Sequence, residues 1–256
     1  GIGAGAAYIF FAYIGFDAVS TTAQEAKNPQ RDLPIGIIAS LLICTVLYIA
    51  VAAVLTGMVP WREVNIEAPV ARAFLDRGLI IPSHIITLGA LAGLTSVMLV
   101  MLLGQTRVLY AMANDGLLPK KFFADIHPKF RTPYKNTILV GLVAAIVGSL
   151  TPIDDIGKMV NIGTLLAFVI VCIAVIVLRR TDPAQPRPFR TPWVPFIPIL
   201  GVIFNGYMMY KLGWVNWARL IVWLGIGMAV YFGYSRKHSQ VQAAIAAEGN
   251  RAVVGD

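Results

Sequence analysis

A glycine and a carboxylate stand two positions apart inside the first apolar stretch of the chain, at Gly15 and Asp17. A carboxylate near the centre of a membrane-crossing helix costs about 2.5 to 3.5 kcal/mol on insertion scales, so such a side chain faces a polar cavity or a partner. Glycine is the residue at which a helix is weakest. The two residues together make an interruption of the helix near Gly15 one of two equally weighted interpretations.

A helix that is interrupted inside a membrane exposes peptide groups that can bind a small ion. The C-terminal end of the first half offers carbonyl oxygens, and the N-terminal end of the second half offers amides. The helix dipole makes these ends favourable for an ammonium and a carboxylate group respectively, and an amino acid carries both. The same residues equally allow an ordinary helix, in which Asp17 caps the turn that begins near Ala18 or pairs with another side chain.

The composition places these residues in a membrane protein. Hydrophobic residues make up 57% of the 256 residues and charged residues only 13%, whereas a soluble domain carries about 25% charged residues. Apolar stretches close to the roughly 20 residues that cross a bilayer recur along the chain, and only helices satisfy their own backbone hydrogen bonds in such stretches. We therefore expect an all-α, polytopic membrane helix bundle over residues 1–238, followed by a disordered cytoplasmic tail over 239–256. The seven predicted spans are 6–24, 34–59, 83–105, 136–151, 159–178, 193–210 and 214–234, of which the fourth is short.

The basic residues are divided unequally between the two sides of this topology. Fifteen of the 21 Lys and Arg residues fall on one side and six on the other. The richer side faces the cytoplasm, so we expect a multi-pass protein of the plasma (cell inner) membrane with a cytoplasmic C-terminus. The formal net charge of +8 then needs no nucleic-acid partner, because a nucleic-acid interface would be one continuous basic patch with aromatic residues.

Other chemistries lack the residue patterns that they require. Cys44 and Cys172 fall inside apolar stretches, and none of the three histidines has a partner at metal-ligand spacing. No nucleophile and base are paired at membrane depth. We therefore expect no catalytic residue, no metal and no cofactor, and hence no enzyme. Because the chain opens at Gly1 without a start residue or a charged leader, we also expect a fragment whose upstream part is missing.

Several motifs, in a consistent order, resemble one transporter superfamily. Residues Phe10–Ser20 and Glu25–Pro34 resemble the sixth transmembrane helix and the following loop of the amino acid–polyamine–organocation (APC) superfamily. Residues Thr106–Pro119, His127–Pro133 and Asn161–Ala167 resemble the end of its helix eight, the next loop and its helix ten. The segment Arg187–Pro192 and the last two spans are similar to the cationic amino acid transporter family in particular.

The resemblance implies a LeuT-like fold, with two inverted repeats of five helices followed by two extra helices. The seven spans would be helices six to twelve, the second repeat and the two extra helices. The implied activity is secondary active transport of an amino acid by alternating access, with a proton as the coupling ion, tied to a lysine on helix five. The missing N-terminal half of the same protein would be a necessary partner, so the chain alone is not expected to transport.

The resemblance also assigns roles around the first span. Phe11 matches an aromatic gate over the substrate, and the carbonyls of Phe11, Ala12 and Ile14 match those that face the substrate ammonium. Gly15 matches the break in the helix. Asp17 matches an acidic position just beyond it, which we interpret as support for the interrupted helix and not as a substrate ligand.

Two further predictions concern selectivity and the outer surface. Thr95 matches a position on helix eight that helps to set substrate size; the alternative is a hydroxyl bonded to its own helix backbone. Thr95 is uncharged, so nothing in this pocket requires a cationic substrate. The amphipathic segment 65–75 predicts a short outer helix, either a lid or a plain interfacial helix. A permease for a polyamine or another small amine is the alternative function, followed by a membrane protein that does not transport.

Overall fold

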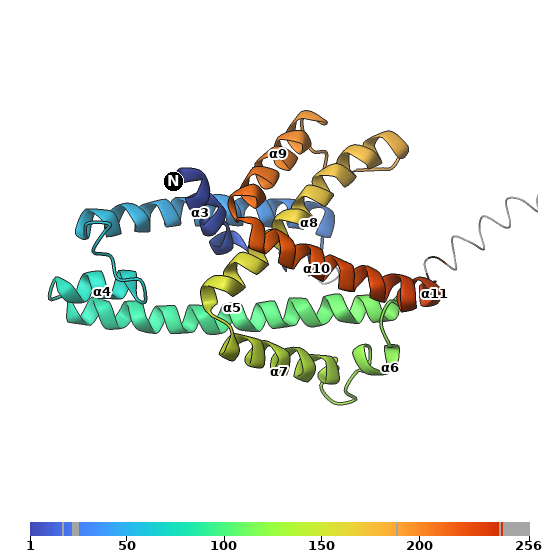
Figure 1. The fold of residues 1–256 in the computed structure, drawn as a ribbon, viewed down its shortest axis with the longest axis horizontal. Helices are drawn as coiled ribbons and strands as arrows, with labels where there is room; N and C mark the ends of the chain where they lie inside the picture. The colour runs from blue at the N-terminus through green and yellow to red at the C-terminus, as the bar shows by residue number, and fades with distance from the viewer. Residues whose placement is uncertain (17, 22–25, 188, 241, 243–256) are drawn as a thin grey trace, which may run out of the picture. The chain divides into compact units, whose positions relative to one another are not determined.

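The computed structural model describes residues 1–16, 18–21, 26–187, 189–240 and 242. Every regular element in this part of the chain is helical, so the predicted all-α class is confirmed. The chain divides into two compact units, one made of Gly1–Ile14 with the residues from Gln105 onward, and one made of Gly15–Gly104. Each unit is described by itself below (Figure 1).

The first unit contains the opening helix and the C-terminal half of the chain. Its elements are α1 (Ile2–Ile9), the 3-10 helix η1 (Phe10–Tyr13), the end of α5 (Ile80–Asn114), α6 (Lys120–Phe123), α7 (Tyr134–Leu150), α8 (Ile153–Thr181), α9 (Phe196–Lys211), α10 (Trp214–Val230), the π-helix η2 (Tyr231–Ser235) and α11 (Arg236–His238). The second unit contains α2 (Ala18–Thr21), α3 (Pro29–Met58), α4 (Pro69–Asp76) and most of α5.

Five candidate spans among the described residues are long and apolar enough to cross a membrane: Ile2–Ser20, Pro29–Met58, Ile80–Asn114, Ile153–Thr181 and Trp214–His238. The sequence predicts seven spans. The two remaining helices, α7 and α9, have 17 and 16 residues, which at 1.5 Å per residue is roughly 25 Å, less than the hydrocarbon thickness of about 30 Å. Both helices lie where the sequence predicts a span.

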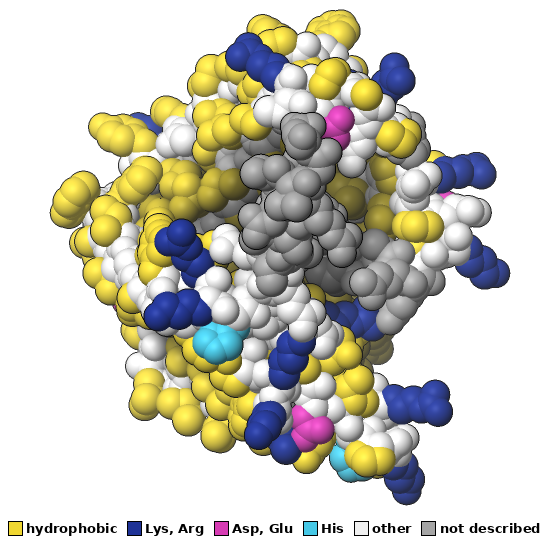
Figure 2. All heavy atoms as spheres, turned by 90° about the vertical axis from the view of Figure 1, so that its right-hand side faces the viewer, with side chains coloured by type: hydrophobic (Ala, Val, Ile, Leu, Met, Phe, Trp, Pro, Cys, Tyr) yellow, Lys and Arg dark blue, Asp and Glu magenta, His cyan; other side chains and the backbone are white. Residues whose placement is uncertain are grey.

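The spans carry apolar side chains on their outer surfaces. Helix α3 has no buried residue in this chain, and Figure 2 shows hydrophobic side chains over much of the visible surface, with Lys and Arg side chains between them. The hydroxyls of Thr45 and Thr56 in α3 donate to the carbonyls of Leu41 and Ala52 at 2.7 and 2.8 Å. Polar groups satisfied inside their own helix, with apolar groups outside, are what a helix in lipid requires.

The core of the first unit forms where α1, α8, α9 and α10 meet. Its buried apolar residues are Ala7, Ile162, Leu165, Met209, Leu212 and Leu220. Helix α8 lies beside α9 along much of its length (Figure 1). Trp217 Nε1 donates to the Met209 carbonyl at 3.1 Å and links α10 to α9. This core gives α1 a fixed surface to pack on.

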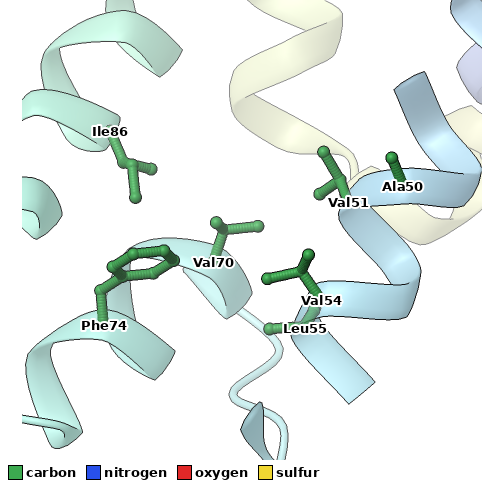
Figure 3. A pocket seen from close by; sticks show the side chains of 7 residues that line it. All are labelled: Ala50, Val51, Val54, Leu55, Val70, Phe74 and Ile86. Carbon is green, nitrogen blue, oxygen red and sulfur yellow. The ribbon is translucent and has the colours of Figure 1, made fainter. Parts of the chain in front are cut away.

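In the second unit, α4 closes one side of a small apolar pocket. The pocket has a volume of about 250 Å³, and Figure 3 shows its lining from α3, α4 and α5. Helix α4 is held by Ser83 Oγ, which donates to the Ala71 carbonyl at 2.8 Å, and by the Arg77 guanidinium, which donates to the Met58 carbonyl at the end of α3. The segment 65–75 therefore contains most of a short helix that is packed on both of its neighbours; its position on the outer side stays a prediction. The pocket is lined by Ala50, Val51, Val54, Leu55, Val70, Phe74 and Ile86.

The C-terminal end of the chain is attached to the loop that follows α5. Ser235 Oγ donates to the Leu117 carbonyl at 2.8 Å, and the Gln240 amide donates to the Asp115 carbonyl at 2.8 Å. Ser239 is 7% exposed, and its Oγ lies 3.2 Å from Asp115 Oδ2. Ser239 and Gln240, the first residues of the predicted tail, are therefore bonded to a loop distant in sequence. Residues 243–256 of the predicted tail lie outside the described residues, and its disorder stays a prediction.

Candidate functional site

The predicted interruption of the first span is present in the backbone. Helix α1 passes into the 3-10 helix η1 at Phe10, and η1 ends at Tyr13. Ile14 is extended, with φ −62° and ψ 128°, and Gly15 has φ +126°. Helical geometry resumes at Ala18. Residues 2–21 therefore do not form one continuous α-helix, so the alternative of an ordinary helix is excluded.

The conformation at Gly15 explains why glycine stands there. A φ of +126° is rarely accessible to residues with a Cβ, whereas glycine adopts it without steric cost. A Cβ at this position would also lie 2.9 Å from the Met101 Cε. Backbone geometry therefore selects glycine at the break, while the Met101 methyl group, at the end of a flexible side chain, could move aside.

The interruption changes the direction of the peptide groups around it. An α-helix requires ψ near −42°, so the Ile14 carbonyl, at ψ 128°, turns away from the direction of the helical carbonyls. The Phe11 carbonyl accepts a hydrogen bond from the Ile14 amide at 3.2 Å, and the Gly15 carbonyl accepts one from the Ala18 amide at 3.1 Å. Ala12 lies between them in η1 and is exposed. A carbonyl oxygen has two lone pairs, so one internal bond leaves it able to accept a second donor.

The two adjacent phenylalanines of η1 lie in different environments. The Phe10 ring packs edge-on against Phe168 of α8, with centroids 5.9 Å apart, and contacts the buried core. Phe11 is 47% exposed. Phe10 therefore anchors η1 to α8, while the large apolar ring of Phe11 is available to cover a bound molecule.

Thr95 lies on an open hollow along α5. Its Oγ1 donates to the Leu91 carbonyl at 2.8 Å, which is the local backbone bond that the sequence allows as an alternative. The hollow has a volume of about 610 Å³ and is lined by Leu91, Ala92, Thr95, Ser96, Leu99 and Val100. Because the bond uses the Thr95 proton, the hydroxyl can serve a ligand there only as an acceptor. This face of α5 thus offers an apolar lining with two small hydroxyls.

Asp17, the remaining predicted site residue, lies outside the described residues. Phe11, Ala12 and Ile14 belong to the first unit, whereas Gly15 and Thr95 belong to the second. Phe11, Ala12, Ile14 and Gly15 lie close together along the chain at the break. Their roles in binding stay predictions. Within the described residues, no group of three or more His, Cys, Asp or Glu side chains has the arrangement of a metal site.

The structure adds residues that sequence reasoning missed. Asn161 of α8 is 1% exposed, and its Nδ2 donates to the Ala7 carbonyl at 3.0 Å. Asn161 opens the motif that resembles helix ten, but neither the motif nor an asparagine in an apolar helix carries information about its partner 154 residues away. Met101 beside Gly15 had no signal at all.

Comparisons with known proteins find similarity to permeases and transporters. A family model described as amino acid permease matches residues 1–232. The branched-chain amino acid permease BcaP of Bacillus subtilis (strain 168) is 50% identical over 242 residues, which cover 94% of this chain and 52% of that protein. The methylthioribose transporter of the same organism is 48% identical over 234 residues, covering 91% of this chain and 50% of that protein.

A plant relative is more distant. The vacuolar cationic amino acid transporter 4 of Arabidopsis thaliana is 30% identical over an alignment of 359 residues, which covers 96% of this chain and 60% of that protein. The chain spans about half the length of the two bacterial relatives, with 52% and 50% coverage. The comparisons thus cover this chain nearly end to end, and each relative only in part.

Proposed function

We propose, from the premise that this chain belongs to the amino acid permease family, that it forms the half of a secondary active amino-acid transporter that contains one interrupted helix of the substrate site. The family is one of transporters, not of enzymes. In the resemblance, the spans of this chain are helices six to twelve of the transporter. They would act with helices one to five of the same protein. In this proposal the chain is inactive without them.

The observation that carries the proposal is the interrupted span. The 3-10 turn, the extended Ile14 and the positive φ of Gly15 leave carbonyls that are not all aligned with a helix axis. In secondary transporters such broken helices lie near the bilayer midplane and present their ends to the substrate and the coupling ion. Carbonyls at the end of α1 and η1 carry the negative end of a helix dipole, which suits the ammonium group of an amino acid.

A neutral aliphatic amino acid is the substrate that the described residues support best. The exposed face of α5 around Thr95 is apolar apart from two hydroxyls and carries no carboxylate that could pair with a cationic side chain. The 50% identity with a relative named for branched-chain amino acids agrees with this choice. The relatives named for methylthioribose and for cationic amino acids define the competing substrates.

The mechanism proposed is alternating access with proton coupling at the plasma membrane. The Phe11 ring would close over the bound amino acid while the carbonyls of Phe11, Ala12 and Ile14 accept from its ammonium group. Asp17 would support the interrupted helix, and no cofactor would be needed. The proton would be taken up by a group in helices one to five.

The test is uptake of radiolabelled leucine by the complete permease, including helices one to five, in liposomes. We expect uptake to be stimulated when the inside is more alkaline than the outside, because an inward proton gradient then drives entry. Unlabelled valine and isoleucine should compete, whereas arginine, methylthioribose and putrescine should compete weakly.

Each competing outcome has a distinct meaning. Uptake of putrescine without uptake of any amino acid would favour the amine permease and reject the proposal. Uptake of leucine that ignores the pH gradient would reject proton coupling and leave amino-acid transport in place. Uptake of arginine in preference to leucine would overturn the choice of a neutral substrate.

A further inference from the structure

The end of helix α1 is held by one side chain from a distant helix. Asn161 of α8 donates from Nδ2 to the Ala7 carbonyl at 3.0 Å. Both residues are buried, with Ala7 0% and Asn161 1% exposed. The last four carbonyls of an α-helix lack partners within the helix, and Ala7 lies among them in α1, which ends at Ile9. The amide therefore bonds the helix at the point where α geometry gives way to the 3-10 turn.

The surroundings of this bond leave it little freedom to move. Ile162 and Leu165, on the same helix as Asn161, are 2% and 0% exposed and belong to the core that contains Ala7. One turn beyond Ala7, Phe10 packs against Phe168. Side chains in a close-packed core sit in fixed rotamers, so the Asn161 amide has a defined direction, and it fixes the position of the carbonyl that it binds.

We propose that Asn161 is a positioning residue for the substrate site: through the Ala7 carbonyl it holds the end of α1 on α8 and so sets the orientation of the Phe11, Ala12 and Ile14 carbonyls. The inference rests on the proposed function, because it assigns those carbonyls to an amino-acid ammonium group. Asn161 itself touches no substrate in this arrangement. It acts through the backbone, four residues before the predicted gate.

A matched control exists in the same unit. Asn136 of α7 is 0% exposed, and its Nδ2 donates to the Thr106 carbonyl at 2.9 Å. Among the described residues, the Oδ1 atoms of Asn136 and Asn161 are the two buried side-chain polar atoms without a hydrogen-bond partner. The two amides therefore have nearly the same burial and bonding, but only Asn161 binds the interrupted span. A general effect of losing a buried amide should appear equally in both.

The first experiment compares Asn161→Asp with Asn136→Asp in the complete permease by equilibrium binding of radiolabelled leucine. At acidic pH the new carboxyl group is protonated and can donate to the Ala7 carbonyl. At alkaline pH it is ionised and accepts only. Lys158, one turn earlier in α8, is already paired with Asp154 at 2.6 Å.

We expect the Kd of Asn161→Asp to match the wild type at pH about 5 and to be roughly tenfold weaker at pH about 8, the size expected for losing one hydrogen bond. Each value is taken relative to the wild type at the same pH. The Kd of Asn136→Asp should stay at the wild-type value at both. A ratio for Asn161→Asp that does not change with pH, or an equal change for Asn136→Asp, would overturn the inference.

A second experiment needs no substrate. Amide hydrogen exchange is measured by mass spectrometry on peptides covering residues 2–14 in Asn161→Leu and Asn136→Leu. We expect faster exchange over Phe10–Ile14 in the first variant alone, and equal exchange in both would reject the positioning role. If the wild type fails to bind leucine, the proposed function fails while this result stands. If Asn161→Leu does not fold, Asn161→Asp, purified at acidic pH and shifted to alkaline pH, gives the same comparison.

Discussion

At the residue scale, the site depends on a single backbone conformation. Gly15 has φ +126°, and the space where its Cβ would lie is taken by Met101 Cε at 2.9 Å. A residue with a side chain would rarely adopt this backbone conformation, whereas the flexible Met101 side chain could shift at little cost. The interruption of the span thus depends on the glycine at position 15. The residues around Gly15 determine which carbonyls and side chains are exposed at the break.

The variant Gly15→Ala tests this conformation. We expect it to destabilise the protein by about 1 to 3 kcal/mol, the cost of a sparsely populated backbone conformation, and to weaken leucine binding as the carbonyls shift. Gly57→Ala is the control, because a Cβ there meets nothing within 4 Å and alanine is favoured in helices by about 1 kcal/mol. Thermal melts and Kd values report both effects; a fully stable Gly15→Ala variant with unchanged binding would contradict the assignment.

The neighbouring phenylalanines give a second prediction at this scale. Phe11→Ala removes an exposed ring, so we expect uptake to fall about tenfold or more, as for loss of a ring that covers the substrate, with little change in the melting temperature. Phe10→Ala removes the ring that packs on Phe168, so it should destabilise the protein by about 2 kcal/mol or more. Wild-type uptake in Phe11→Ala would show that Phe11 is not a gate.

At the element scale, the ends of helices are joined by specific polar bonds. Helix α4 is tied to α3 and α5 through Arg77 and Ser83, and the segment after α10 is tied to the loop after α5 through Ser235 and Ser239. Apolar faces in lipid gain no hydrophobic free energy from meeting each other, so packing and hydrogen bonds determine helix association. These bonds contribute to the association of the helices that they join.

The variant Gly116→Ala tests the attachment of the C-terminal segment. Gly116 has φ +88°, and a Cβ there would collide with the His238 carbonyl. We expect the segment from Tyr231 to His238 to detach, measured as faster hydrogen exchange and easier proteolysis near residue 238. Gly141→Ala in α7, where a Cβ meets nothing within 4 Å, should leave the attachment intact. Equal protection of the segment in the two variants would mean that the loop does not hold it.

At the scale of the whole molecule, the distribution of basic residues predicts a cytoplasmic C-terminus. A test uses single cysteines in a background where Cys44 and Cys172 are replaced by alanine. Glu67→Cys lies in the loop before α4 and Lys121→Cys lies in α6, both at exposed positions. In intact cells we expect a membrane-impermeant maleimide to label the first and to reach the second only after permeabilisation. The reverse pattern would invert the predicted orientation.

Much of the fold follows from local sequence. The apolar stretches predict where helices lie, because the bilayer sets their length and their backbone bonds are internal. Gly15 and Asp17 pointed to an interruption or to an ordinary helix about equally, and the resemblance to the APC superfamily placed the break at Gly15. What the sequence did not predict were the bonds that attach Ser239 and Gln240 to the loop after α5, because they depend on packing against a segment distant in sequence.

The sequence by itself determined that this is an all-α membrane protein, because composition and span length act on neighbouring residues. Its motifs resembled the APC superfamily, whereas Gly15 and Asp17 left an interrupted and an ordinary first span equally open. Only the tertiary structure decided that Phe10 packs inward while Phe11 stays exposed, that Asn161 binds Ala7, and that Ser235 binds Leu117. These partners lie more than a hundred residues apart. Their contacts depend on the combined packing of several helices, which no short stretch of sequence encodes.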